Sequence, residues 1–567
     1  MKNILQLKTL ILIALIFAIS PSFAQKKRKA FKKEILYWDI EETEILSKGY
    51  VHNDPSFSYF GQKEGLWTFW YRNGKVKEKS YFSKGKYEFE SLHYYPSGKL
   101  MLSEYYKNGL EDSTSISYFE NGRVAEKGNY KNGFKIGKWE YWFADSTRKK
   151  TEFYDTLGNV KLIDYWDKNR KQTVINGNGN KITYFGSGKI KETYTYKNGL
   201  LHGTFEERKA NKSLLIKGEF VNGKKHGTWE EYFLFTNQLL SQKTFENDSI
   251  TGKYTRYFEN GKVNIQGVFD NNKKQGKWNW FDKNGGKDME GEFQNDLQHG
   301  KWNFYYPNGK IKTTGEFALG NKNGKWEYFY KNGIKRKEGN YINNLKEGEW
   351  SVWFENEKLL HKGSYLNNRE NGLWESWFQN GNKKDKGTYK NGSLFGKWEG
   401  WYPNGKQKYS GEWEGDFKTG DWKHWYSNGL LQEEGSYTLI TQKRKNKGLE
   451  NKITKSVKTG DWIMYSKHDG SLISEESYKK GVKSGKWKYY YPGGQIISSE
   501  MNYHKGLLHG AFKTYSRTGI LLSEVNYKGS VKHGYTIIYD QNGKEKKRIK
   551  FREGYKVKNS GPVYSPF

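Results

Sequence analysis

The feature that most constrains this chain is a tryptophan that recurs every 24 residues through its central part. Each of these tryptophans lies two residues after a glycine, as in Gly300-Lys301-Trp302. A fixed period of about 20–50 residues indicates one small supersecondary unit stacked on copies of itself. Such an array usually presents a long surface rather than a closed pocket, which favours binding over catalysis. The ladder comprises Trp278, Trp302, Trp326, Trp350, Trp374, Trp398 and Trp422.

One period, residues 300–323, has the pattern of a β-hairpin. Residues 302–306 are rich in aromatic side chains, and residues 311–317 alternate as a return strand would. Between them, Asn308-Gly309 suits a tight turn, for which we predict type I′. No segment between turns is long enough for a helix. We therefore predict an all-β fold: about twenty antiparallel hairpins of 24 residues that form one long, twisted sheet.

A second ladder, of glycines, lies inside the predicted return strands. Each glycine is followed two residues later by an aromatic ring, as Gly315 is by Phe317. A glycine inside a strand often marks a close approach by another group. We predict that the tryptophan of each hairpin covers such a glycine. The ladder includes Gly291, Gly315, Gly339, Gly363, Gly387, Gly411 and Gly435.

The N-terminal residues have the pattern of an export signal. Lys2 and Lys8 precede an apolar run from Leu10 to Ile19, which is too short to span a membrane. Residues 22–24 then provide a small-x-small cleavage site. We expect a cleaved signal and an exported, periplasmic, outer-surface or secreted protein. The alternative is an uncleaved anchor, because six basic residues follow directly and positive flanks tend to remain cytoplasmic.

The chain divides into a few segments by pattern and charge. We predict a signal peptide at 1–24, a basic segment at 25–56, hairpin repeats at 57–545 and a C-terminal tail at 546–567. An irregular copy covers 142–178. Residues 438–457 form a basic insertion, expected to be a loop, with Lys443, Arg444, Lys445 and Lys447 as candidate binding residues. In the second and third copies, Phe89 and Ser113 stand where glycines are due.

The motif G-K-W-x-x-Y-Y-x-N-G-K, followed by G-x-Y/F-x-N-G, resembles the MORN repeat. It is most similar to the bacterial variant of YwqK-like proteins, often described as toxin–antitoxin antitoxin components. The resemblance covers roughly residues 57–545. It implies hairpin repeats in an extended antiparallel sheet, with roles in protein scaffolding or lipid contact. An antitoxin role fits poorly with an export signal, since antitoxins act in the cytoplasm.

No group of residues in the sequence carries recognisable chemistry. There is no cysteine, and the turns that resemble phosphate or calcium loops lack the required spacing. His202 and His226 share one slot of adjacent copies, which is too little for a metal site. We therefore expect no catalytic residue, no metal and no cofactor.

The expected function is that of a non-enzymatic scaffold in the envelope or secreted space. Its partner would be a protein or a polysaccharide bound along the β surface, with Tyr305 and Phe329 as further candidate contacts. The net charge of +34 leaves open an alternative, a binder of anionic lipid or polysaccharide surfaces. An antitoxin-like inhibitor is the other alternative. Nucleic acid is not expected if the chain is exported, and the oligomeric state is open.

Overall fold

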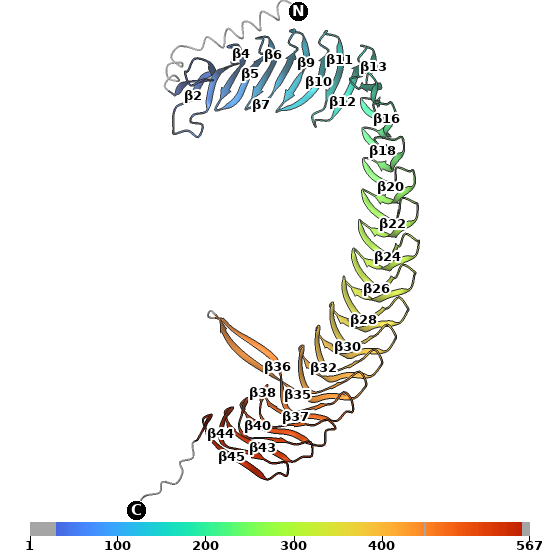
Figure 1. The fold of residues 1–567 in the computed structure, drawn as a ribbon. Helices are drawn as coiled ribbons and strands as arrows, with labels where there is room; N and C mark the ends of the chain where they lie inside the picture. Colours follow the sequence, from blue (N-terminus) through green and yellow to red (C-terminus); the bar gives the residue numbers. More distant parts are fainter. Residues whose placement is uncertain (1–29, 447–448, 558–567) are drawn as a thin grey trace, which may run out of the picture. The chain divides into compact units, whose positions relative to one another are not determined.

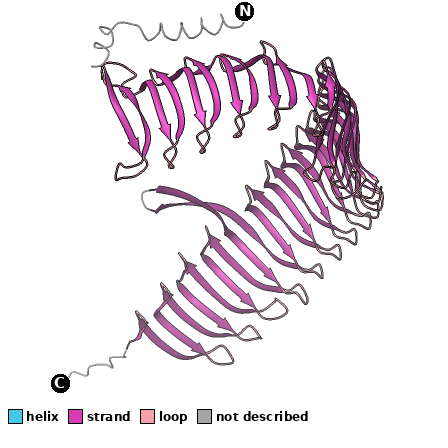
Figure 2. Cartoon of the chain, turned by 90° about the horizontal axis from the view of Figure 1, so that it is seen from above, coloured by secondary structure: helices cyan, strands magenta, loops and turns pink. Residues whose placement is uncertain are grey.

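The computed structural model describes residues 30–446 and 449–557, without the side chains of 444–446 and 449–451. The predicted signal peptide, residue Lys447 and the end of the predicted tail lie outside this part. The described residues form strands and turns with no helix. The strands form one antiparallel sheet of 46 strands. The expected all-β architecture of antiparallel hairpins is confirmed (Figures 1 and 2).

The chain consists of two compact units, which meet between Lys273 and Lys274. Within each unit, neighbours along the chain are neighbours in the sheet. The strands of the first unit are β1 Phe31–Tyr37, β2 Ile45–His52, β3 Lys63–Trp70, β4 Val76–Ser83, β5 Lys86–Tyr94, β6 Leu100–Lys107, β7 Leu110–Glu111, β8 Ser113–Tyr118, β9 Val124–Lys131, β10 Phe134–Trp142, β11 Arg148–Tyr154, β12 Val160–Trp166, β13 Gln172–Ile175, β14 Asn178–Tyr184, β15 Ile190–Lys197, β16 Leu200–Arg208, β17 Leu214–Val221, β18 Lys224–Tyr232, β19 Leu239–Glu246, β20 Ser249–Tyr257 and β21 Val263–Asp270.

The second unit continues the same alternation of short strands and turns. Its strands are β22 Lys273–Phe281, β23 Lys287–Gln294, β24 Leu297–Tyr305, β25 Ile311–Ala318, β26 Asn321–Phe329, β27 Lys335–Ile342, β28 Leu345–Trp353, β29 Leu359–Leu366, β30 Arg369–Trp377, β31 Lys383–Lys390, β32 Ser393–Trp401, β33 Gln407–Glu414, β34 Phe417–Trp425, β35 Leu431–Asn446, β36 Leu449–Tyr465, β37 Leu472–Lys479, β38 Val482–Lys483, β39 Gly485–Tyr490, β40 Ile497–His504, β41 Leu507–Leu508, β42 Gly510–Tyr515, β43 Leu521–Lys528, β44 Val531–Tyr539, β45 Glu545–Arg552 and β46 Tyr555–Lys556.

Two kinds of turn close the strands. At the Asn-Gly turn, the Tyr306 amide donates to the Lys310 carbonyl and the Gly309 amide donates to the Tyr306 carbonyl, both at 2.8 Å. Of the loop residues only Gly309 has a positive φ, +80°. This is a type I turn followed by a left-handed glycine, so the predicted type I′ geometry is wrong here. Type I′ geometry occurs at the opposite end, where Asn343 and Asn344 have φ values of 49° and 68°.

Each regular copy also contains a β-bulge at the glycine before its tryptophan. Glu290 pairs with Asn303, whereas Glu292 pairs with His299, so the second strand has two extra residues. Gly300 lies in this bulge with a φ of +63°, a conformation that costs glycine little. The bulge therefore explains why a glycine precedes the tryptophan in every regular copy.

Strands extend beyond the predicted repeat boundaries. The basic N-terminal segment already contains the paired strands β1 and β2. The predicted C-terminal tail contains β45 except for its first residue, Glu545, and all of β46. The irregular copy at 142–178 contains β11, β12 and the short β13, so the sheet continues through it.

Candidate binding surfaces

The tryptophans lie on one face of the sheet, the indole face, defined by Trp302 and its register partner Gly315. The Trp302 ring does not cover Gly315. It covers Gly291 of the preceding return strand, where an added Cβ would lie 2.1 Å from Cδ2 of the indole. The Trp302 indole N–H donates to the Glu292 carbonyl at 3.1 Å. The contact leaves the ring 1 % exposed, so glycine at position 291 is a steric requirement.

The same arrangement recurs through both units. In each case the glycine lies in the return strand that precedes the tryptophan. The pairs are Gly49 with Trp67, Gly128 with Trp139, Gly218 with Trp229, Gly315 with Trp326, Gly339 with Trp350, Gly363 with Trp374, Gly387 with Trp398, Gly411 with Trp422 and Gly435 with Trp462.

Aromatic rings and lysines enclose the indoles from the remaining sides. Phe293 and Phe317 meet Trp302 edge-to-face at centroid distances of 5.3 and 5.8 Å. In many copies a lysine four residues before the tryptophan places Nζ 3.7–5.0 Å from the ring centroid, an attractive cation–π contact. The indole ladder is thus the hydrophobic core of a single-layer sheet, and its rings are not available to a partner.

Trp374 is the half-buried member of the ladder. The position that holds Phe304 in a regular copy is Ser376 here, and the lysine position is Glu370. The result is a shallow hollow of about 120 Å³ beside Trp374, lined in part by His361 and Asp385. The Ser376 hydroxyl donates to Asp385 at 3.2 Å, so the hollow is polar at one side.

The opposite face, the charged face, is defined by Glu290 and Asn303. The Tyr305 hydroxyl donates to Glu290 at 2.7 Å, and the Lys287 ammonium donates to the same carboxylate at 2.6 Å. The hydrogen bond from Lys287, followed by that from Tyr305, lowers the pKa of Glu290 to about 2. Burial, reinforced by Glu290, raises the pKa of Tyr305 to about 12. Tyr305 is therefore committed to an internal network.

Phe329, the other predicted contact, lies half-buried beside a turn. Its carbonyl accepts a hydrogen bond from the Tyr306 hydroxyl of the preceding copy at 2.8 Å. The Asn308 side chain likewise donates to the Lys331 carbonyl at 2.8 Å, and Lys310 donates to Asn332. The Tyr-x-Asn-Gly-Lys turn therefore links each copy to the next through its own side chains. Related bonds join Tyr71 to Tyr94, Asn73 to Pro96, Tyr330 to Trp353, Asn356 to Gln379, Tyr402 to Trp425 and Asn404 to Ser427.

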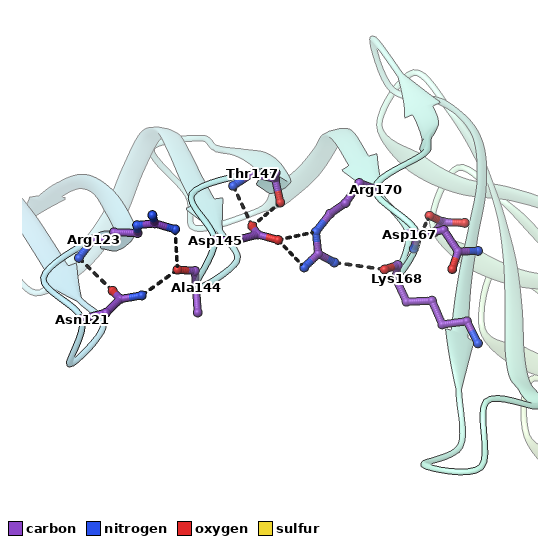
Figure 3. A network of polar contacts seen from close by, with 9 residues as sticks. Asn121, Arg123, Ala144, Asp145, Thr147, Asp167, Lys168 and Arg170 are labelled. Atoms are coloured by element: carbon purple, nitrogen blue, oxygen red, sulfur yellow. Dashed lines mark hydrogen bonds and ion pairs between the residues drawn. The ribbon is translucent and has the colours of Figure 1, made fainter.

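The irregular copy keeps this edge connected by other residues (Figure 3). Asn121 donates to the Ala144 carbonyl at 2.7 Å. At the next turn, Arg170 donates to Asp145 from Nε at 3.0 Å and from Nη2 at 2.7 Å. Hydrogen bonds from Thr147, and then from Arg170, hold the pKa of Asp145 well below its usual range. An Arg–Asp pair thus replaces the Asn and Lys contacts of a regular turn.

The basic insertion is a long hairpin made of β35 and β36, and the loop expected there is wrong. Its pairing continues from Thr438 opposite Val457 out to Asn446 opposite Leu449. The hairpin extends past the neighbouring strands (Figure 1). Lys443 and Lys452 lie directly opposite each other and are exposed. The backbones of Arg444 and Lys445 belong to β35.

The charged face of the first unit carries an aromatic patch that the sequence reasoning missed. It consists of Tyr50, Leu66, Tyr81, Phe89 and Tyr105, with exposed fractions of 50, 57, 37, 49 and 41 %. Leu66 and Tyr81 are register partners. The Phe89 ring meets Tyr81 at 5.2 Å and Tyr105 at 6.3 Å, both edge-to-face. The sequence feature that could have indicated this patch is Phe89, because it occupies a position where the repeat has a glycine.

The described residues provide no evident site for chemistry. No group of three or more His, Cys, Asp or Glu in that part of the chain is placed to hold a metal ion. No helix in the described ranges is long and apolar enough to cross a membrane.

Comparison with known proteins identifies the repeat. The family model of the MORN repeat variant matches residues 63–84, 88–108, 111–132, 250–271, 298–318, 322–343, 346–367, 370–391, 418–438, 483–505 and 508–528. Eleven segments of this chain match the MORN repeat variant. The matched segments lie in both units. The MORN motif corresponds in the structure to the bulged tryptophan strand, its turn and the return strand that follows.

Similarity to solved structures adds nothing to this identification. A crystal structure of TcdB2-TccC3-Cdc42 is 10% identical, with a TM-score of 0.11, over 92% of this chain and 31% of that chain. A crystal structure of TcdB2-TccC3 is 9% identical, with a TM-score of 0.12 and the same coverage. The chain spans only 31% of their length, and scores this low carry no argument. No curated protein matches.

Proposed function

We propose that this MORN-repeat protein is an exported, non-enzymatic scaffold. It binds a protein or polymer partner along its β surface, and the β35–β36 hairpin provides the main recognition element. The observation that carries the proposal is the combination of a locked array with one long hairpin that departs from it. The linked turns suit a scaffold, and the hairpin offers a surface that no other copy within the described residues has.

The turns give the array its stiffness. At the Asn-Gly edge, side chains of Tyr306, Asn308 and Lys310 each bond the backbone of the next copy. At the other edge, Asn344 accepts from the Lys322 amide at 2.7 Å. Each copy is thus tied to a neighbour at both edges, in addition to the strand ladder. Loops and projections on such a rigid support are common binding elements.

The charge of the hairpin indicates the chemistry of the partner. Lys443 and Lys452 are direct cross-strand neighbours, and like charges in that position destabilise a hairpin. Lys455 adds a third exposed positive charge on the same ribbon. An acidic partner surface would complement these positive charges on binding. The partner we propose is therefore an acidic segment of a protein or of an envelope polymer.

Export is supported by the sequence pattern of residues 1–24. It is tested by fractionating cells that produce the chain and measuring the N-terminal mass of the recovered protein. A mature N-terminus at Gln25 in the exported fraction supports the proposal. Full-length protein confined to the cytoplasm contradicts it.

The binding proposal is tested by affinity capture from an envelope extract at low and high salt. The test variant replaces Lys443, Lys452 and Lys455 with Ser, which keeps the strands. The matched control replaces three exposed lysines of the regular array, Lys301, Lys312 and Lys331, and changes the net charge equally. We expect a specific partner that the control retains and the hairpin variant loses.

The result with salt separates this proposal from the charge-driven alternative. Binding to anionic surfaces through net charge alone would fall equally in both variants and would disappear at high salt. That result would refute recognition by the hairpin and favour the binder of anionic lipid or polysaccharide. Capture that is identical for wild type and hairpin variant would also refute it.

A further inference from the structure

We propose that the aromatic patch of the first unit is a binding site for a neutral carbohydrate chain. The patch lies on strands β2 to β6, on the charged face. The β35–β36 hairpin belongs to the other unit, so the two proposals stand on different residues and can fail separately.

The backbone of Phe89 is strained, so the patch lowers the stability of the fold. Its φ is +60°, the left-handed conformation that the regular copies give to glycine at this bulge. A bulky residue there is strained, and such strain is often retained at functional sites. Burial of the ring does not offset this strain, since Phe89 is 49 % exposed. Its ring contacts are edge-to-face with Tyr81 and Tyr105, which are themselves part of the exposed patch.

The patch departs from the composition of the same face elsewhere. Tyr81 and Tyr105 occupy the slot that Glu316 and Asn340 fill in regular copies, and Leu66 occupies the slot of Lys301. Two successive copies thus replace polar side chains with rings or an aliphatic chain. One strand, β5, lies between Tyr81 and Tyr105, so two strand spacings place them about 10 Å apart along the sheet. The rings form a short row across the strands.

The size of the patch argues against a stable protein interface. Four rings of roughly 150–250 Å² each, about half exposed, together with Leu66 give roughly 400–500 Å² of accessible apolar surface. This matches the usual size of a functional surface patch. A second copy of this chain, or a stable protein partner, would need about 800 Å² on each side.

The polar groups favour a carbohydrate. Within the described residues, the hydroxyls of Tyr50, Tyr81 and Tyr105 make no hydrogen bond, so they can donate to or accept from sugar hydroxyls. The apolar C–H face of a sugar ring can pack on the exposed aromatic rings. Charges of both signs border the patch, because Lys33 pairs with Tyr50, Glu88 with Tyr81 and Glu90 with Tyr105, so the patch has no preference for a polyanion. A neutral polysaccharide fits these features together.

The test is electrophoresis of the whole chain through native gels that contain a neutral polysaccharide. The probes are mixed-linkage β-glucan, xylan, galactomannan and glycogen. We expect at least one of them to retard the wild-type chain, equally at low and high salt. Retardation by none of the four would overturn the proposal.

Phe89→Gly provides the decisive variant, because it removes the ring and relieves the backbone strain together. We expect about tenfold weaker binding, the effect of losing one interface anchor, with no loss of thermal stability. Ser113→Gly is the matched control. Ser113 has a φ of 93° in the equivalent bulge, so this change relieves strain without removing a ring. It should leave the binding unchanged.

Tyr105→Ser should weaken binding similarly, whereas the triple lysine variant of the β35–β36 hairpin should bind as wild type does. Unchanged retardation of Phe89→Gly would overturn the proposal. So would equal loss in Ser113→Gly, which would indicate an effect on the fold. Loss of polysaccharide binding in the hairpin variant alone would place the site on the hairpin and refute the patch.

Discussion

The regular copies and the two degenerate copies solve the same packing problem in different ways. In a regular copy, Trp326 covers Gly315, whose missing side chain leaves room for the indole. In the degenerate copies, Ser80 and Ser91 occupy the equivalent positions, with their hydroxyl oxygens 2.5 Å apart and both residues buried. The next copy pairs Ser115 with Glu104 at 3.2 Å. A large ring over bare backbone is thus exchanged for two hydrogen-bonded polar side chains.

The comparison shows that the tryptophan and the residue beneath it form one packing unit and change together. A small residue at one position without the matching change at the other would leave either a cavity or a clash. The same two copies also lack the bulge glycine and hold Phe89 and Ser113 at positive φ. Both the glycine–tryptophan pair and the bulge glycine of the regular copy are therefore missing in one region. The aromatic patch lies in this same region.

The largest expected effect comes from breaking the regular pair. Trp326→Ala should lower the free energy of unfolding of the surrounding copies by about 3–5 kcal/mol, because it leaves a cavity over Gly315. The matching change in the degenerate copy, Ser91→Ala, should cost only about 1 kcal/mol for its buried hydrogen bond. Native-state hydrogen exchange of the affected strands measures both. Equal losses would refute the distinction between the two kinds of pair.

Adding a methyl group beneath the indole should have a smaller effect. In Gly315→Ala the Cβ would lie 2.2 Å from Cδ2 of Trp326, so the ring must move, at about 1–3 kcal/mol. The double variant Gly315→Ser, Trp326→Ser transplants the degenerate pair. Its loss in the free energy of unfolding should be at least about 1 kcal/mol smaller than the sum of the losses in Gly315→Ser and Trp326→Ser. A double-mutant cycle measures this difference. Strict additivity would show that the two positions are not a unit.

Restoring the bulge glycine should stabilise the degenerate copies. Phe89→Gly and Ser113→Gly should each raise the free energy of unfolding by up to about 1 kcal/mol, because they remove a strained positive φ. The reverse change in a regular copy, Gly300→Ser, should destabilise by a similar amount. Thermal melting of the three variants provides the measurement. Loss of stability in Ser113→Gly would show that the positive φ there is not strained.

The smallest effect concerns the charged face. The pKa of Glu290 falls from 4.5 to about 2 in the folded chain. A lowered carboxyl pKa adds stability above the unfolded pKa, and this contribution is lost as pH falls from about 4.5 to about 2. Because the pair is near solvent, its contribution is about 0.5 kcal/mol. Glu290→Gln should flatten this part of the stability–pH curve, and an unchanged slope would contradict the role of Lys287 and Tyr305.

Much of the fold followed from the sequence, and much less of the binding surfaces did. The hairpin period is visible because Trp302 and Gly315 repeat at fixed spacing. The candidate Tyr305 is held by Glu290, a contact between strands that spacing alone does not specify. The lysines at 443–455 suggested a loop, since charge conceals the regular pairing of β35 with β36. The aromatic patch combines residues from several copies, which only the register brings together.

The sequence by itself determined that the chain forms hairpins, where they turn and that the tryptophans of the regular copies lie over a bare glycine. These are local properties of strand alternation, turn residues and side-chain volume. Only the tertiary structure decided which glycine lies under each ring. The bulge at Gly300 adds two residues to one strand, and this shift carries Trp302 over Gly291 instead of its register partner Gly315. The physical reason is that face and register depend on pairing across strands, which a single strand does not encode.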